Sequence, residues 1–385
     1  MREASRAQAT TWLVVAIASA VLGPLLAAGS AGADSITTPL PMTSLPRSGP
    51  EDFSVNLSRL AYPEVSPSAK VVVVNEDDVT SALPAAVLAR ATSSPLLLAR
   101  ALDLTKAQKQ EVARLRPDGA YLVGAASALS DKVSSSLAHA GARQQQRING
   151  NDSADTARRV ALLVDDRDAE AKAKGAPAFD AAVVVNPASP DAATGSALAA
   201  ALRLPVLFTQ RDAVSPATTD ALAILGITST LVVGGATSVG PGVMTQLPGA
   251  KRLGGSDPTL TSEAVAVESV TRGEPTNVVY VTDGERPVEQ AAVGAAVGRL
   301  GGIMLAEPDA SPAATRRSLD KLGLTARVDR LVVARVDFGG TSTRLRLTLA
   351  VLISLIGVAT IVVALAHRDD THGSAQPSPV SHPST

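Results

Sequence analysis

The stretch LVVGGATSVGPGV, residues 231–243, decides which fold we expect for this chain. Its apolar run ends in the paired glycines Gly234 and Gly235, and Gly240 follows where a helix can begin. Such a stretch is typical of a loop that holds a phosphate at a helix N-terminus, or of a tight turn between a strand and a helix. Which of the two applies depends on whether the chain repeats the stretch, and on what the copies keep.

The chain does repeat this stretch and its surroundings. Residues 121–130 read YLVGAASALS, with Gly124 in the place of Gly234 and Ala125 in the place of Gly235. An apolar run upstream occurs three times, as VVVVN at 71–75, AVVVN at 182–186 and VVYVT at 278–282. A dinucleotide-binding fingerprint needs three glycines at fixed spacing, which neither copy has. We therefore expect a structural turn in these two copies, within an internal repeat of three copies.

Each copy alternates short apolar runs with alanine-rich amphipathic stretches. Unbroken runs of Val and Leu are typical of strands that are buried on both faces. The stretches between them, such as 104–116, have helical spacing. This order predicts an α/β fold of three tandem parallel-sheet repeats of the Rossmann or flavodoxin-like kind. We place the repeats at 70–165, 180–273 and 277–336, and the third is truncated after the run 331–336.

The N-terminus is typical of an export signal. Arg2 and Arg6 precede an apolar segment at 13–26, and the small residues 31–33 come directly before Asp34. We expect residues 1–33 to be a cleaved signal peptide, with an uncleaved membrane anchor as the alternative. Residues 34–69 then form a lead segment that contains several Pro and Ser.

The C-terminus carries a second apolar segment. Residues 347–366 contain no charge and, at about 1.5 Å per residue, are long enough to cross a hydrocarbon core of about 30 Å. Arginines lie on both sides, so a transmembrane helix is favoured over a buried core helix. With the export signal, this predicts a single-pass protein of the cell membrane whose body faces the cell wall. A linker at 337–346 precedes the helix, and a disordered cytoplasmic tail at 367–385 follows it.

The amino-acid composition excludes several classes of function. The formal net charge of −1 argues against a protein that coats nucleic acid. The chain has no cysteine, and its aromatic content of 2% leaves few ring platforms for bases or sugars. His139 is the only histidine outside the apolar C-terminal region, and the acidic run 76–78 suits a helix N-terminus better than a catalytic pair. We therefore predict no catalytic residue, no metal site and no cofactor.

Two copies share a closing motif after their third helix. Residues 147–157 read RINGNDSADTA and residues 252–262 read RLGGSDPTLTS. The motif pairs Arg147 with Arg252, Asp152 with Asp257, and Thr156 with Thr261. Each arginine can pair with the aspartate that follows it and fix a turn, or it can bind phosphate or carboxylate on a polymer.

These motifs resemble the cell-wall-binding repeat type 2 family of Gram-positive bacteria. The resemblance covers about 70–336 and rests on the closing motif, on residues 205–209 (PVLFT), on residues 233–235 (VGG) and on Asp191-Ala192. The family's Arg-Tyr pair in the closing motif is replaced by Ser153-Ala154 in the first copy and Pro258-Thr259 in the second.

The resemblance implies non-catalytic, non-covalent binding to a wall polymer. The partner would be a teichoic-acid-like or other anionic glycan, bound in positively charged clefts between repeats that pack around a pseudo-threefold axis. The candidate polymer contacts are Arg147, Arg252, Asp152, Asp257, Thr156, Thr261 and Thr209. The expected role is envelope attachment or organisation. A membrane-tethered extracellular receptor for a small molecule is the alternative, because parallel sheets bind ligands at the carboxyl ends of their strands.

Overall fold

The computed structural model describes residues 42–45, 49–64, 70–172, 181–308 and 312–334. In that part of the chain, the structure contains no helix with both the length and the hydropathy of a membrane span. The expected signal peptide, the expected transmembrane helix at 347–366 and the tail lie outside the described residues.

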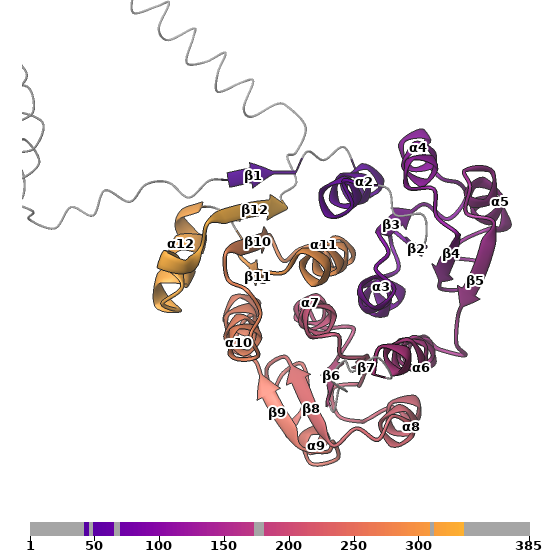
Figure 1. The fold of residues 1–385 in the computed structure, drawn as a ribbon. Coiled ribbons are helices and arrows are strands. Elements are labelled where there is room, and N and C mark those ends of the chain that lie inside the picture. The colour runs from indigo at the N-terminus through magenta and orange to yellow at the C-terminus, as the bar shows by residue number, and fades with distance from the viewer. Residues whose placement is uncertain (1–41, 46–48, 65–69, 173–180, 309–311, 335–385) are drawn as a thin grey trace, which may run out of the picture. The chain divides into compact units, whose positions relative to one another are not determined.

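Two repeats form matching four-stranded parallel sheets (Figure 1). The first has the order β3-β2-β4-β5 and the second the order β7-β6-β8-β9. Their strands are β2 (Val71–Asn75), β3 (Leu96–Ala99), β4 (Gly119–Val123), β5 (Gln144–Ile148), β6 (Ala181–Val185), β7 (Val206–Phe208), β8 (Ser229–Val233) and β9 (Ala250–Leu253). The first strand of each sheet is buried along its whole length, as its unbroken apolar sequence predicts. The predicted α/β class with parallel-sheet repeats is confirmed.

The third sheet is completed from the other end of the sequence. It contains β10 (Val278–Thr282), β11 (Ile303–Ala306) and β12 (Arg330–Ala334), and its fourth strand is β1 (Met42–Ser44). β1 lies parallel to β12, with Thr43 opposite Val332. The sequence predicts no strand in the lead segment 34–69. The third copy is short in sequence because residues that precede the first copy supply the missing strand.

Helices connect the strands. They are α2 (Pro50–Ala61), α3 (Val79–Ala91), α4 (Lys106–Leu115), α5 (Asp131–His139), α6 (Ser153–Lys172), α7 (Ala192–Leu202), α8 (Pro216–Ile224), α9 (Pro241–Met244), α10 (Pro258–Thr271), α11 (Pro287–Leu300) and α12 (Pro312–Lys321), with a short 3₁₀ turn at Thr325–Arg327. Several begin with recognisable caps. The Thr105 hydroxyl, for example, accepts from the backbone N–H of Gln108, whose side chain bonds back to Thr105.

Three equivalent helices pack against one another where the units meet. α3, α7 and α11 each follow the first strand of a unit, and each contacts the other two (Figure 1). Their alanines belong to one continuous hydrophobic core. A Cβ added at Gly294 of α11 would lie 2.9 Å from the Cα of Ala197 on α7. Small residues are therefore required here, because larger ones would separate the two backbones.

Three further helices link neighbouring units. α2, α6 and α10 each follow the fourth strand of one unit and pack on the second strand of the next, which is β3, β7 or β11 respectively. In two of these contacts a buried serine bonds to the neighbouring strand. The Ser54 hydroxyl accepts from the Leu98 N–H at 3.0 Å, and the Ser262 hydroxyl accepts from the Ala306 N–H at 3.0 Å. Every unit therefore contributes one helix to its neighbour, and the third unit contributes α2 to the first.

Candidate functional site

The motif arginines hold the loop after the third strand. Arg147 Nη1 donates to the carbonyls of Gly124 at 3.2 Å and Ala125 at 3.1 Å, and Nη2 donates to Leu129 O at 2.7 Å. Arg252 is half-buried, and burial lowers the pKa of its guanidinium. Its Nη1 and Nη2 donate to the carbonyls of the equivalent loop in the second unit, at Gly234 and Val239, both at 2.7 Å. Backbone carbonyls are therefore the observed partners of both arginines.

The rest of the closing motif builds the strand-to-helix connection. Asp152 accepts from the Asp155 N–H at 2.7 Å, and Asp257 accepts from the Leu260 N–H at 2.9 Å, so both lie at helix N-termini. The buried hydroxyls of Thr156 and Thr261 accept from glycine N–H groups, at 2.9 Å from Gly150 and 3.1 Å from Gly255.

Thr209, the remaining candidate, is buried after β7, and its hydroxyl donates to backbone carbonyls of the loop 210–213. Of the seven candidate contacts, only Asp152 and Asp257 are exposed.

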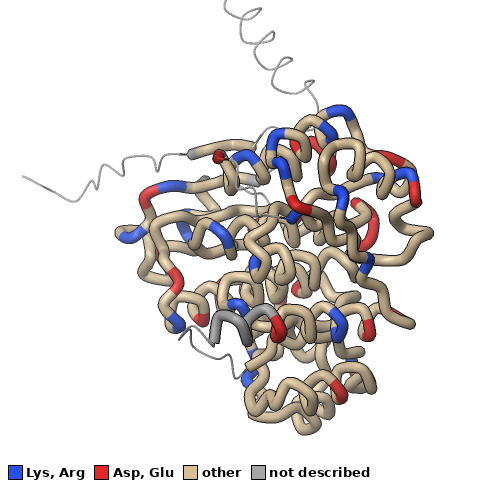
Figure 2. The backbone as a smooth tube through the Cα atoms, turned by 45° about the vertical axis from the view of Figure 1, so that its right-hand side comes forward, with Lys and Arg blue, Asp and Glu red and all other residues tan. Residues whose placement is uncertain are grey.

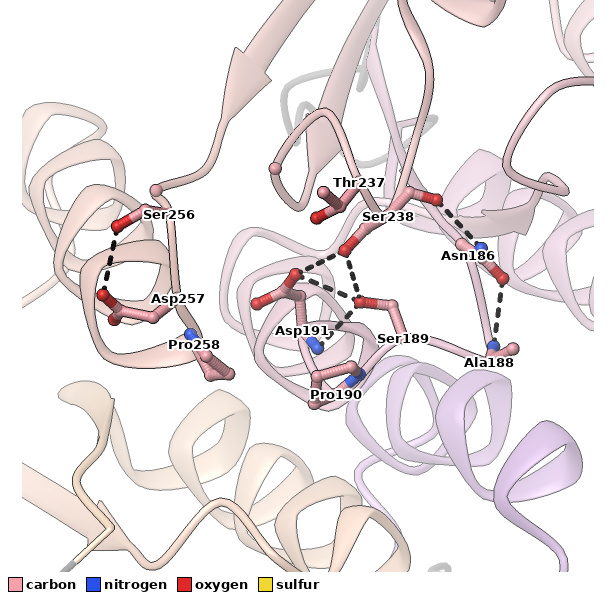
Figure 3. A pocket seen from close by; sticks show the side chains of 12 residues that line it. Asn186, Ala188, Ser189, Pro190, Asp191, Thr237, Ser238, Ser256, Asp257 and Pro258 are labelled. Carbon is pink, nitrogen blue, oxygen red and sulfur yellow. Dashed lines mark hydrogen bonds between the residues drawn. The ribbon is translucent and has the colours of Figure 1, made fainter.

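A pocket of about 360 Å³ lies in the second unit at the carboxyl ends of its strands (Figure 3). It lies beside β6 and β8. The chain runs from β6 to β7 on one side of β6 and then returns to β8 on its other side, so the strand order reverses between β6 and β8. Such a reversal is where open parallel sheets bind ligands. Three loops line the pocket, with Asn186, Ala188, Ser189, Pro190 and Asp191 from the first, Gly235, Thr237 and Ser238 from the second, and Gly255, Ser256, Asp257 and Pro258 from the third.

A carboxylate stands at the centre of this pocket's hydrogen bonds. Asp191 Oδ2 accepts from the Ser238 hydroxyl at 2.9 Å and from the Ser189 hydroxyl at 3.1 Å (Figure 3). Asp191 Oδ1 is buried and has no hydrogen-bond partner, and the residue as a whole is 5% exposed. In Figure 3 this oxygen points toward the loop that carries Ser256 and Asp257. A buried polar atom without a partner is costly, so this oxygen marks a functional candidate.

The first unit also has a carboxylate beside the equivalent turn, but both oxygens of that carboxylate accept hydrogen bonds. Asp78 Oδ1 accepts from the Ser81 N–H at 3.0 Å and from the Thr80 hydroxyl at 2.8 Å, and Oδ2 accepts from the Ser81 hydroxyl at 2.6 Å. A Cβ on Gly124 would lie 3.3 Å from Asp78 Oδ2, and one on Gly234 would lie 3.2 Å from Asp191 Oδ2. The two carboxylates therefore lie at matching places, although they come from different positions in their loops.

These contacts answer the question posed by the glycines. Gly124 and Gly234 have φ values of 117° and 123°, a region that side chains with a Cβ rarely enter. Each glycine is needed by the turn itself, and the group beside it is an aspartate, which repels phosphate.

A cluster of arginines lies at the carboxyl ends of the three central helices. Arg90 is in the last turn of α3, Arg203 follows α7, and Arg299 is in the last turn of α11. A Cβ on Gly298 of α11 would lie 3.0 Å from Arg90 Cδ and 2.9 Å from the Ala200 carbonyl of α7, so the Arg90 side chain reaches α11 where α11 packs closely on α7.

The charges of Arg203 and Arg299 act on the guanidinium group of Arg90. Burial lowers the pKa of Arg90, and the charges of Arg203 and Arg299 lower it further, while Tyr62 and Glu274 act against them. The Arg299 guanidinium lies 5.4 Å from the ring centre of Tyr62. The carboxylate of Glu274 also lies near Arg90 and Arg203, so the cluster contains one acidic residue. Basic and acidic residues are intermixed along the backbone as a whole (Figure 2).

Sequence reasoning missed this cluster, although a signal was present. Arg203 and Arg299 each lie 17 residues after the end of an equivalent apolar run, which is 182–186 in the second unit and 278–282 in the third, but neither belongs to the glycine turn or the closing motif.

An acidic pair lies at another junction between units. Arg100, after β3, has its Nε 2.5 Å from Glu51 Oε1 in the first turn of α2 and 3.5 Å from Glu76 Oε1 at the end of β2. Burial raises the pKa of Glu76 to about 7, and the neighbouring charge of Glu51 contributes in the same direction. In the part of the chain that the structure describes, no group of three or more His, Asp or Glu residues is arranged to hold a metal ion.

The described residues form three interlocked α/β units, with a polar pocket in the second unit and a cluster of arginines where the units meet. Residues 147–244 match the model of the cell wall binding domain 2 (CWB2) family. The matched segment begins with the closing motif of the first repeat and ends in α9, so it includes the linking helix and three strands of the second unit.

Two curated proteins of Bacillus subtilis are similar to this chain. The chain is 30% identical over 232 residues to the N-acetylmuramoyl-L-alanine amidase LytC of Bacillus subtilis (strain 168), over 60% of this chain and 43% of the amidase. It is 32% identical over 143 residues to the amidase enhancer of the same organism, over 37% of this chain and 18% of that protein. The chain therefore spans less than half of the length of these relatives.

Solved structures show the same fold. Cwp6 from Clostridium difficile superposes with a TM-score of 0.66 at 20% identity, over 80% of this chain and 48% of Cwp6. Cwp8 from the same organism gives a TM-score of 0.61 at 20% identity, over 76% of this chain and 49% of Cwp8.

Proposed function

We propose that this protein is a non-catalytic, membrane-anchored exported protein that binds an anionic cell-wall polymer without a covalent bond. The family assignment supports cell-wall binding as the general role. The observation that carries the anionic specificity is the cluster of Arg90, Arg203 and Arg299 at the ends of α3, α7 and α11.

The cluster has the charge that a polyanion requires. Arg203 and Arg299 are exposed and Arg90 is half-buried, so a bound chain can reach at least two guanidinium groups. Guanidinium groups bind phosphate and carboxylate with two parallel hydrogen bonds. An anion placed among three mutually repelling cations also relieves their repulsion, which favours a teichoic-acid-like or other anionic glycan.

The sequence supports the location of the body. An export signal at 1–33 and an apolar segment at 347–366 would place residues 34–346 between membrane and wall. A protein held in the membrane at one end and bound to the wall through its repeats would connect the two layers, which suits envelope attachment or organisation.

A binding assay with isolated cell walls tests this function. We expect the full chain in non-ionic detergent to bind the walls, with binding that falls as salt rises because exposed charges are screened. The double variant Arg203→Ala/Arg299→Ala should lower the affinity by about tenfold or more. Arg143→Ala, which removes an exposed arginine before β5, is the matched control. Equal binding by the double variant and the control would contradict the proposed site.

The closing motif provides a second set of candidate contacts. Its exposed members, Asp152 and Asp257, can meet a polymer directly, whereas Arg147 and Arg252 already hold carbonyls. The same assay on Asp152→Asn and Asp257→Asn shows whether the motif takes part in binding.

The pocket beside β6 and β8 favours a second function, that of a membrane-tethered receptor for a small molecule. The two functions differ in the wall assay. A chain that does not bind walls, but whose melting temperature rises with a small ligand, would be a receptor.

A further inference from the structure

The unpartnered oxygen of Asp191 sets the chemistry of the pocket in the second unit. Oδ1 accepts no hydrogen bond, although Oδ2 of the same carboxylate accepts two. The oxygen has almost no contact with bulk water. A donor that reaches it would therefore meet little competition from solvent, and the interaction would be strong for a charged donor.

The charge of the pocket selects a cation. Its lining includes the carboxylates of Asp191 and Asp257 and contains no lysine or arginine. Asp257 Oδ1 accepts a hydrogen bond from the Leu260 N–H at the N-terminus of α10. Asp257 Oδ2 accepts from the Ser256 hydroxyl at 3.2 Å, and both residues are exposed. Two carboxylates without a basic partner disfavour an anion and favour an ammonium group.

The remaining lining suits a hydroxylated ligand. Thr237 and Ser256 bring hydroxyl groups to the pocket beside the two carboxylates (Figure 3). A volume of about 360 Å³ is at the lower end of the range for small-molecule sites and is sufficient for one sugar ring.

We propose that this pocket binds a single amino-sugar unit with a free ammonium group, which donates to Asp191 Oδ1 while the ring hydroxyls bond to Asp257, Thr237 and Ser256. The site is separate from the arginine cluster and does not rest on the anionic-polymer function. The matching carboxylate of the first unit has no oxygen without a partner, because both oxygens of Asp78 accept hydrogen bonds. The proposed site is therefore assigned to the second unit and not to the first.

Calorimetric titration of the full chain in non-ionic detergent with D-glucosamine tests the site, at a pH where the amine is protonated. D-Glucose and N-acetyl-D-glucosamine are the uncharged comparisons, and CaCl₂ is a cation without a sugar ring. We expect one glucosamine per chain and at least about tenfold weaker binding for both uncharged sugars. Asp191→Asn should weaken glucosamine binding by about tenfold or more, whereas Asp78→Asn, the matched change in the first unit, should leave it unchanged.

The outcomes separate the site from its alternatives. Binding of glucose as tight as glucosamine, equal loss in both aspartate variants, or displacement of glucosamine by Ca²⁺ would each overturn the proposal. If Asp191→Asn does not fold by circular dichroism, Asp257→Asn, which changes an exposed residue, replaces it and should weaken glucosamine binding. The arginine double variant should bind glucosamine normally, so a failure of wall binding does not affect this result.

Discussion

At the scale of single residues, the polar side chains that recur in both copies of the closing motif act mainly on the backbone. Arg252 holds two carbonyls of the loop that follows β8, and Thr261 accepts from the Gly255 N–H. Sequence reasoning identified these residues correctly as equivalent pairs but expected an arginine–aspartate pair as the structural alternative. The choice of partner could not be read from spacing, since it depends on which carbonyls the folded loop turns toward β9.

Gly234 gives a test of the turn. We expect Gly234→Ala to destabilise the protein by about 1–3 kcal/mol, because φ is 123° and the new Cβ would lie 3.0 Å from Ser238 Cβ. Gly242→Ala is the control, since a Cβ there meets nothing within 4 Å and its φ is not in the positive region. Thermal unfolding of both variants checks the prediction, and an equal effect of the two changes would contradict it.

At the scale of elements, the central helices explain the unusual abundance of alanine. α7 is buried from Ala192 to Ala201, so it has no polar face. The sequence predicted these helices and their parent strands from apolar runs. It did not show that they pack on one another, because a helix buried by its own sheet and one buried by three units have the same composition.

The linking helices give a second test. Ser54→Ala and Ser262→Ala should each lower the free energy of unfolding by about 1–3 kcal/mol, because the Leu98 and Ala306 N–H groups lose buried acceptors. Ser135→Ala, which removes an exposed hydroxyl from α5, is the control and should change stability by less than about 0.5 kcal/mol. Chemical denaturation measures all three. A neutral effect of both buried changes would show that water replaces the serine oxygens.

At the scale of the whole described chain, the junction of the third and first units contains a carboxyl group with a raised pKa, that of Glu76. The pKa of Glu76 is raised from 4.5 to about 7, so the folded state binds more protons than the unfolded state between these values. Stability contributed by the protonated group is present at low pH and is lost as pH rises through about 7. We expect the melting temperature to fall across this window, and Glu76→Gln to flatten the fall.

Scans of melting temperature against pH, for the wild-type chain and Glu76→Gln, measure this effect. Asp166→Asn changes a carboxylate on the linking helix α6 and serves as the control, since it should keep the wild-type slope. A Glu76→Gln curve parallel to that of the wild type would show that the junction does not titrate near neutral pH.

The sequence by itself determined the repeat, the alternation of strand and helix, and the place of the glycine turns. Those features follow from local rules, since burial on both faces and a positive φ restrict residue choice at each position. Only the tertiary structure decided that β1 completes the third sheet, that Arg90, Arg203 and Arg299 meet, and that Asp191 keeps an oxygen without a partner. Each of these depends on contacts between residues that are far apart in the chain. Local sequence patterns do not reveal such contacts, because they form only when the separate elements pack together.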